Sequence, residues 1–185
     1  MSRSDPVRGP TARRSAIDAG ILLLAEGFGS GRIPLGPGTW GSLVGVLWLI
    51  LLLRMPDPVW AGISALGAIG IAIPICSRAE RILGREDPGS VVLDEIVAMP
   101  LTFLGPLLVL GTWPAASGVA ELAHRFWPEW IVGFLAFRVF DIAKPGPIRR
   151  IQTLHSGWGV VADDLLAALA AAVVTAIPTL LHAPR

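Results

Sequence analysis

Long uncharged apolar stretches constrain this chain more than any other feature of its sequence. A helix that crosses the hydrocarbon core of a bilayer needs about 20 mostly apolar residues. Four stretches meet this requirement: residues 33–53, 58–77, 96–120 and 165–184. A fifth, residues 130–143, is apolar up to position 137 and then contains Arg138 and Asp141. Since 53% of the residues are hydrophobic and only 16% are charged, we predict an all-α, multi-span helical membrane protein with about four to five transmembrane helices.

The first part of the chain is polar and has no apolar core followed by a cleavage site, so no signal peptide is expected. We expect residues 1–14 to form a flexible N-terminus and residues 15–185 to form a single membrane-embedded domain. The apolar residues 21–25 are too few to span a bilayer and are expected to form a short interfacial helix, with Asp18 in its first turn. A soluble helical bundle with an unusually apolar core is the alternative fold.

Basic residues are distributed unevenly among the connections between the apolar stretches. If the N-terminus, residues 78–95 and residues 138–164 share one side, that side holds twelve of the fifteen Lys and Arg residues. The other side holds Arg54, Arg125 and Arg185. The positive-inside rule then places the first side in the cytoplasm. A formal net charge of +1 gives no overall attraction to nucleic acid, so no nucleic-acid partner is expected.

Most carboxylates fall on the same predicted side, each near the boundary of an apolar stretch. They are Glu26, Glu86, Asp87, Asp94, Glu95, Asp141, Asp163 and Asp164. Carboxylates at the edge of hydrocarbon are costly unless they are paired, hydrated or bound to a cation. Solvation in a loop suits Glu80 and Glu121, but it suits Asp94 and Glu95 badly, because apolar residues flank them on both sides. We therefore expect separate segments to bring their carboxylates into one shared polar site.

Residues 27–42 (GFGSGRIPLGPGTWGS) are rich in glycine and proline and lead directly into an apolar helix. Such a loop can bring backbone N–H groups close to an anion, and the helix start behind it adds a favourable dipole. No Gly-Lys-Ser/Thr sequence ends the loop and no predicted strand precedes it, so a nucleotide-binding P-loop is not indicated. An anion-binding loop and a merely flexible loop stay equally open at this point.

Two further polar segments stand beside apolar stretches. On a helix Arg138 and Asp141 share one face with Lys144 following, and Pro145 is expected to end the helix near Lys144. These side chains could serve an anionic group and its metal, or form an ion pair used only for packing. Residues 163 and 164 are adjacent aspartates that open the last apolar stretch, and capping of a helix start explains one of them but not readily both.

In combination these segments resemble the phosphatidylglycerophosphatase A family of bacterial membrane lipid phosphatases. The resemblance covers nearly all of residues 26–172 and is carried by residues 27–45 (GFGSGRIPLGPGTWGSLVG), 86–95 (EDPGSVVLDE) and 137–166 (FRVFDIAKPGPIRRIQTLHSGWGVVADDLL). Ala98 and Ala168 stand where the family commonly has glycine, and Ser156 stands where a further glycine is frequent. These departures affect helix packing and loop shape rather than charge.

The resemblance implies Mg²⁺-dependent hydrolysis of phosphatidylglycerophosphate to phosphatidylglycerol and phosphate, in phospholipid biosynthesis. It further implies a phospholipid substrate and an active site on the cytoplasmic face of the bacterial inner membrane. A small membrane transporter or channel for a cation or an organophosphate is the alternative from another class, since buried carboxylates and broken apolar segments suit it too. Against it, the acids gather at one face and no internal repeat relates the two halves. A catalytically inactive lipid-binding relative is a third possibility, and oligomeric state stays open.

Other phosphate chemistries find no support in the residues. Cys76 is not part of a Cys-x5-Arg motif, no Asp-x-Asp motif occurs, and the signature of CDP-alcohol phosphotransferases is missing. The three histidines are isolated from one another: His124, His155 and His182. Carboxylates and a few cations remain, and oxygen ligands of this kind are those that Mg²⁺ prefers.

We predict a site built from these groups. Metal ligands or water activators are expected to be Asp94, Glu95, Asp163 and Asp164, with Glu86 and Asp87 as further candidate ligands. Arg138 and Lys144 are the expected phosphate contacts, and Asp141 either orients them or joins the metal. The phosphate loop is expected to be shaped by Gly36, Gly38, Thr39 and Gly41. Which acid acts as the general base stays open.

Overall fold

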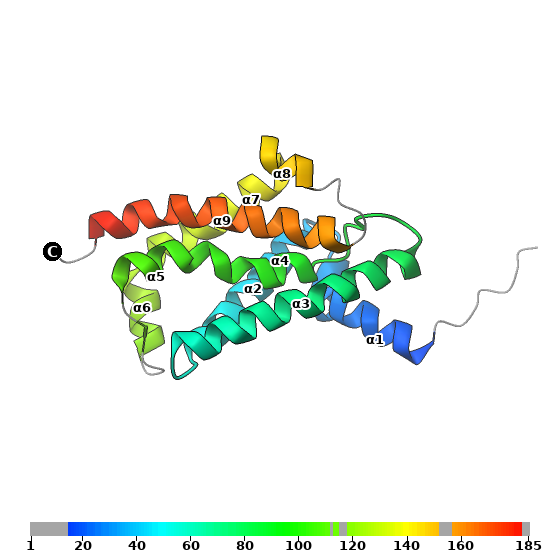
Figure 1. Cartoon of the computed structure of the whole chain (residues 1–185), viewed down its shortest axis with the longest axis horizontal. Coiled ribbons are helices and arrows are strands. Elements are labelled where there is room, and N and C mark those ends of the chain that lie inside the picture. Colours follow the sequence, from blue (N-terminus) through cyan, green and yellow to red (C-terminus); the bar gives the residue numbers. More distant parts are fainter. Residues whose placement is uncertain (1–14, 112, 115–117, 152–156, 183–185) are drawn as a thin grey trace, which may run out of the picture.

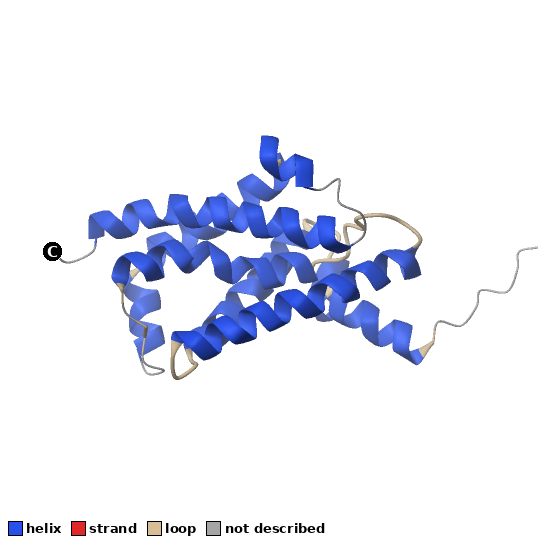
Figure 2. Ribbon diagram, viewed as in Figure 1, coloured by secondary structure: helices blue, strands red, loops and turns tan. Residues whose placement is uncertain are grey.

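The computed structural model describes residues 15–111, 113–114, 118–151 and 157–182, and within these residues the regular elements are all helical (Figure 2). In chain order they are α1 (Ala16–Ala25), η1 (Gly27–Arg32), α2 (Pro37–Leu53), α3 (Pro58–Leu83), α4 (Leu93–Ala98), η2 (Met99–Phe103), α5 (Leu104–Leu110), α6 (Val119–Arg125), α7 (Trp127–Ala143), α8 (Gly146–Ile151) and α9 (Gly157–His182). The all-α prediction is confirmed. The expected N-terminal segment 1–14 and His155 lie outside the described residues.

Three helical segments among the described residues are long and apolar enough to cross a bilayer. They are Pro58–Leu83, Leu93–Leu110 and Gly157–Leu181. Helices α2 and α7 have 17 residues each, which corresponds to about 26 Å and approaches the thickness of the hydrocarbon core. The architecture is therefore that of a multi-helix membrane protein, as predicted, with three full-length segments and two shorter apolar helices.

Two of the expected helix boundaries are wrong. The apolar stretch 96–120 was expected as one span, but its helical segment begins at Leu93 and stops at Gly111, which is left-handed with φ 61°. The last helix was expected to start at its two aspartates, but α9 begins six residues earlier, at Gly157. The reason is tertiary packing: the backbone N–H of Gly157 donates to Ser77 Oγ at 3.0 Å, and no side chain would fit there against α3. Helix capping therefore explains neither aspartate.

Helix α9 packs against α7, α5, η2, α3 and α4, and runs along the upper side of the bundle in Figure 1. Close approach depends on small residues, as it does in other membrane bundles. A Cβ atom on Gly105 of α5 would overlap the carbonyl oxygen of Ala172. Ala98 and Ala168, the two positions where glycine was more usual, are fully buried in this packing.

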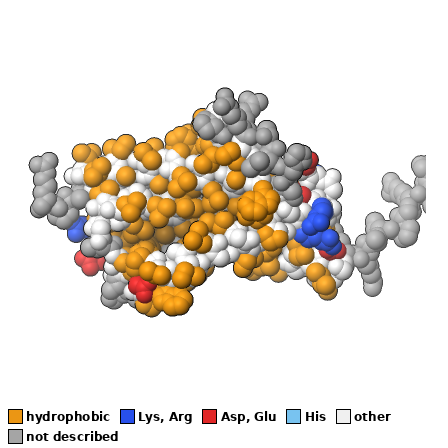
Figure 3. Space-filling model, in the orientation of Figure 1, with side chains coloured by type: hydrophobic (Ala, Val, Ile, Leu, Met, Phe, Trp, Pro, Cys, Tyr) orange, Lys and Arg blue, Asp and Glu red, His pale blue; other side chains and the backbone are white. Residues whose placement is uncertain are grey.

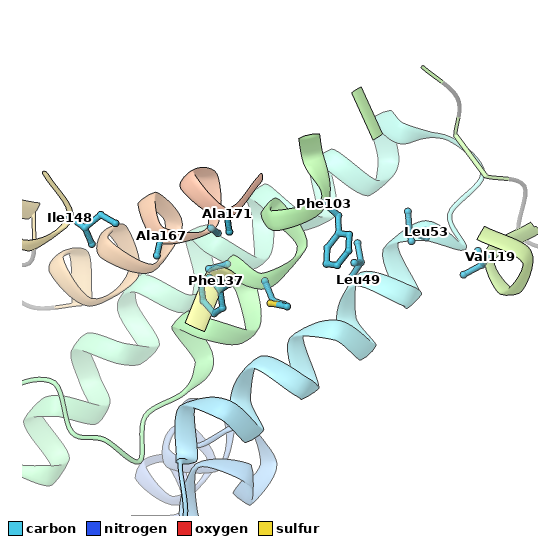
Figure 4. Close-up of a cluster of buried hydrophobic side chains, with 11 residues drawn as sticks. Leu49, Leu53, Phe103, Val119, Phe137, Ile148, Ala167 and Ala171 are labelled. Atoms are coloured by element: carbon cyan, nitrogen blue, oxygen red, sulfur yellow. The ribbon is translucent and has the colours of Figure 1, made fainter. Parts of the chain in front are cut away.

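Two clusters of buried apolar side chains hold the helices together. Figure 4 shows the larger one, in which Phe137 of α7 lies beside Ala171 of α9, and Phe103 lies near Leu49 of α2. The smaller cluster joins α1, α3, α4 and α9. The outer surface is also apolar over most of the face in Figure 3, where charged side chains gather towards the two ends. An apolar exterior suits a protein whose solvent is lipid.

Helix α1 is attached to the side of α3 near one end of the bundle. Ser15 caps it by accepting a hydrogen bond from the Asp18 N–H, so Asp18 stands in the first turn as predicted. Arg78 of α3 donates to Asp18 Oδ1 at 2.8 Å, and this hydrogen bond lowers the pKa of the Asp18 carboxyl. Ile17, Leu23 and Leu24 remain exposed, which is typical of a helix that lies in the membrane interface.

Candidate active site

A polar cavity of about 250 Å³ lies where the start of α2, the α3–α4 loop, α4, the end of α7 and the second turn of α9 meet. Its lining consists of Gly36, Pro37, Gly38, Asp87, Gly89, Val91, Asp94, Glu95, Arg138, Asp141, Lys144, Val160, Asp163 and Asp164. A larger cavity of about 480 Å³ lies between α2, α3 and α5, and the described residues that line it carry no charge. The smaller cavity is therefore the candidate reactive site.

Three carboxylates meet in this cavity. Asp94 and Glu95 of α4 and Asp164 of α9 each place one oxygen within 4.8 Å of the others. Their exposed fractions are 5%, 9% and 3%. In each residue one oxygen (Asp94 Oδ1, Glu95 Oε2, Asp164 Oδ2) has no hydrogen-bond partner among the described residues. Burying like charges this close together is costly unless a cation or protons are shared between them, and an all-oxygen donor set suits Mg²⁺.

Arg138 lies beside this cluster and is held by its own helix. Its Nη1 donates to Asp141 Oδ2 at 2.6 Å, three residues further along α7, and lies 3.8 Å from Glu95 Oε1. The predicted common face of Arg138 and Asp141 is confirmed. Asp141 is not part of the three-carboxylate cluster, and its contact with Arg138 favours an orienting role over a metal-binding one.

Lys144 stands just after α7, as Pro145 led us to expect. It has a left-handed backbone (φ 41°), and its N–H caps the helix by donating to Phe140 O. Its Nζ donates to Asp163 Oδ2 at 2.5 Å. Burial would lower the pKa of Lys144, but the hydrogen bond and the charge of Asp163 raise it above its ordinary value. Asp163 is thus paired with a cation, whereas the adjacent Asp164 belongs to the carboxylate cluster.

The glycine- and proline-rich loop presents the first turn of α2 to the cavity. Gly36 is left-handed (φ 62°) and Pro37 occupies the first helical position. A Cβ atom on Gly38 would overlap Glu95 Oε1 and lie 2.9 Å from Arg138 Nη2, so only glycine lets this turn approach the charged groups. Of the other predicted loop residues, Thr39 donates its N–H to Gly36 O, and Gly41 packs on Val92. Neither of the two lines the cavity.

The α3–α4 loop contributes Asp87 but not Glu86. Asp87 lines the cavity with a left-handed backbone (φ 41°), whereas Glu86 is exposed and does not line it. Glu80 Oε1 accepts a hydrogen bond from the Asp87 N–H at 3.0 Å. Glu80 thus also has a contact with the loop, beyond the solvation expected of it.

The sequence did not single out two polar residues that are buried in the structure, Ser42 and Glu129. Ser42 is fully buried on α2, where its hydroxyl contacts Gly38 and Arg138. Its spacing of four residues from Gly38 was a signal that could have found it. Glu129 lies in the first turn of α7 and is 1% exposed.

The chain is similar to proteins of one family over most of its length. A family model described as Phosphatidylglycerophosphatase A matches residues 23–178. The chain is 38% identical over 156 residues to Phosphatidylglycerophosphatase A of Haemophilus influenzae (83% of this chain, 85% of the relative). It is 34% identical over 152 residues to the Escherichia coli protein of the same name (81% and 78%). A Bacteroides thetaiotaomicron protein provisionally named a phosphatidylinositol-3-phosphatase is 31% identical over 160 residues (84% and 91%). No solved structure matches the chain at a significant level.

Proposed function

Because the chain belongs to the phosphatidylglycerophosphatase A family, we propose that it hydrolyses phosphatidylglycerophosphate to phosphatidylglycerol and phosphate, with Mg²⁺, at the cytoplasmic face of the bacterial inner membrane. The observation that carries the proposal is the cavity in which three buried carboxylates face Arg138 and Lys144. Such a site can hold a cation and a phosphate group side by side. Family membership favours a phosphatase over a transporter.

Asp94, Glu95 and Asp164 are the residues that would hold the Mg²⁺, since each places one oxygen within 4.8 Å of the others, and each has a buried oxygen without a hydrogen-bond partner among the described residues. When bound there, the ion supplies electrostatic polarisation of the phosphoryl group. One or two carboxylates commonly suffice for Mg²⁺, which keeps several of its waters. This leaves a carboxylate of the cluster available for another task.

The phosphate group is bound by the two cations and the start of α2. A phosphomonoester carries a charge of about −1.5 to −2 at neutral pH. Arg138, held in place by Asp141, and Lys144, held by Asp163, offset the charge on its oxygens. The N-terminal turn of α2 at Gly38 adds a favourable helix dipole.

The reaction itself needs water to attack phosphorus while the bond from phosphorus to the glycerol oxygen breaks. A carboxylate oxygen without a hydrogen-bond partner in the described part of the chain, such as Asp164 Oδ2, is an acceptor for the proton that the water loses. The departing glycerol oxygen must gain a proton, and Lys144 Nζ is a donor at the rim of the same cavity.

The test is phosphate release by the full chain in detergent, with phosphatidylglycerophosphate as substrate and phosphatidylinositol 3-phosphate as the comparison. We expect release from the first lipid in Mg²⁺, no release in excess EDTA, and recovery when Mg²⁺ is restored. Protein that is folded and Mg²⁺-loaded but releases no phosphate from phosphatidylglycerophosphate would overturn the proposal. Faster turnover of the inositol lipid would move the assignment to that head group.

A further inference from the structure

We infer that Ser42 is a positioning residue that aligns Arg138 with the first turn of α2, so that both meet the same phosphate group. The inference rests on the proposed function and adds a residue to its binding site. Ser42 does not line the cavity, so it acts through Arg138 rather than by touching substrate. Its side chain is fully buried.

The hydrogen bonds of Ser42 determine which partner its hydroxyl donates to and which it accepts from. Its proton is donated to Gly38 O at 2.8 Å, one turn earlier on α2. A serine hydroxyl has one proton and two lone pairs, so the oxygen is left to accept from Arg138 Nη1 at 3.4 Å. The same hydroxyl therefore connects the carbonyl of the cavity-lining glycine to the guanidinium group.

Ser42 differs from the other groups around Arg138 in charge. Asp141 and Glu95 also approach Nη1, but each is a carboxylate that competes with a phosphate for the guanidinium charge. A neutral acceptor holds the guanidinium group without lowering the local positive potential. Ser42 moreover lies on α2, whereas Asp141 and Glu95 lie on α7 and α4. Its hydrogen bond with Arg138 therefore links α2 to α7, the two helices that contribute groups to the anion site.

The alternative is that Ser42 only makes the local hydrogen bond that serine and threonine often make in membrane helices. Thr175 provides the matched control, because it is fully buried and its hydroxyl donates to Ala171 O at 2.6 Å, also four residues earlier. No cation is recorded against the Thr175 hydroxyl among the described residues. Thr175→Val therefore removes the local bond alone.

The experiment measures binding of inorganic phosphate by calorimetry, in Mg²⁺, to detergent-solubilised wild type and to Ser42→Ala, Ser42→Cys and Thr175→Val. Cysteine keeps nearly the volume of serine but is a weak acceptor, so it remains informative if alanine disturbs folding. We expect the dissociation constant for phosphate to rise about fivefold in both Ser42 variants and less than about twofold in Thr175→Val. Wild-type affinity in the Ser42 variants would overturn the inference.

A double-mutant cycle tests whether Ser42 acts through Arg138. In an Arg138→Lys background, Ser42→Ala is expected to change the dissociation constant by less than about twofold, since the guanidinium group is gone. A full fivefold effect in that background would contradict a positioning role. Failure of the proposed function gives a different result: the wild-type protein would bind inorganic phosphate but release none from phosphatidylglycerophosphate.

Discussion

Glu80 Oε1 accepts a hydrogen bond from the backbone N–H of Asp87 at 3.0 Å, across seven residues of chain. The bond spans the end of α3 and the loop that follows it, and it holds Asp87 in a left-handed conformation that costs a non-glycine residue about 1 to 2 kcal/mol. In this conformation Asp87 lines the polar cavity. Glu80 therefore shapes the site from outside it.

This relationship predicts different outcomes for two substitutions of Glu80. Glu80→Ala removes the acceptor and should lower kcat/KM severalfold, because the loop loses the bond that offsets its strain. Glu80→Gln keeps an acceptor oxygen and should stay within about twofold of wild type. Steady-state assays of both, with exposed Glu121→Gln as the control, decide the point. A glutamine variant as impaired as the alanine variant would mean that the charge matters instead.

Gly38→Ala should lower turnover by about 100-fold or more. The new Cβ atom would overlap Glu95 Oε1 and press on the Arg138 guanidinium group, so the first turn of α2 must withdraw from the cavity. Gly67→Ala on α3 is the control, because its Cβ atom would meet nothing within 4 Å. Activity and melting temperature are measured together. Retained activity in Gly38→Ala would show that α2 does not form the phosphate site.

Asp94→Asn, Glu95→Gln, Asp163→Asn and Asp164→Asn should each reduce turnover by about 100-fold or more. The substitutions of Asp94, Glu95 and Asp164 remove charge from the carboxylate cluster. Asp163→Asn removes the charged partner of Lys144. Glu121→Gln again controls for a general charge effect. Activity within a few-fold of this control in all four variants would mean that the site lies elsewhere.

The same cluster predicts a trade-off between activity and stability. In EDTA, Asp164→Asn should melt at a higher temperature than wild type, because it removes one of three buried like charges. Added Mg²⁺ should raise the melting temperature of wild type but raise that of the variant less. Thermal unfolding in the two buffers measures both effects. If Mg²⁺ stabilises the variant as much as wild type, Asp164 is not a ligand.

Membrane topology is tested by labelling introduced cysteines on intact cells with an impermeant maleimide, in a Cys76→Ala background. Gly89→Cys and Gly146→Cys should stay protected if the cavity faces the cytoplasm, and Glu121→Cys should react. Glu121 is a better reporter than Asp57, whose side chain caps α3 by accepting from two backbone N–H groups. A reactive Gly146→Cys beside a protected Gly89→Cys would divide the proposed site between the two faces.

The convergence of the polar segments could be predicted because charge and hydrophobicity act over the whole chain. The predicted span count assigns most basic and acidic residues to one side, and the start of α2, the α3–α4 loop and the end of α7 do meet at one polar cavity. The pairing of Arg138 with Asp141 follows from helical spacing alone.

What could not be predicted depends on partners far away in the sequence. The early start of α9 depends on a hydrogen bond from the Gly157 N–H to Ser77 Oγ, far away in the sequence. The two glycines near this start, Gly157 and Gly159, favour a loop when the sequence is considered alone. The role of Ser42 needs an arginine 96 residues away. Neither Ser77 nor Ser42 carries a charge, and the spacing of Ser42 from Gly38 does not reveal its contact with Arg138.

The size of the polar cavity determines how the protein meets its substrate under the proposed function. About 250 Å³ accommodates a phosphate group and its immediate surroundings, but not the two fatty acyl chains of a phospholipid. The lipid therefore stays in its leaflet throughout turnover, and the enzyme samples it by lateral diffusion in two dimensions. Its effective substrate concentration is a surface mole fraction, so diluting the lipid with inert detergent or phospholipid slows the reaction even when the bulk concentration is unchanged. The two products leave in different phases: phosphate into water, and phosphatidylglycerol along the membrane.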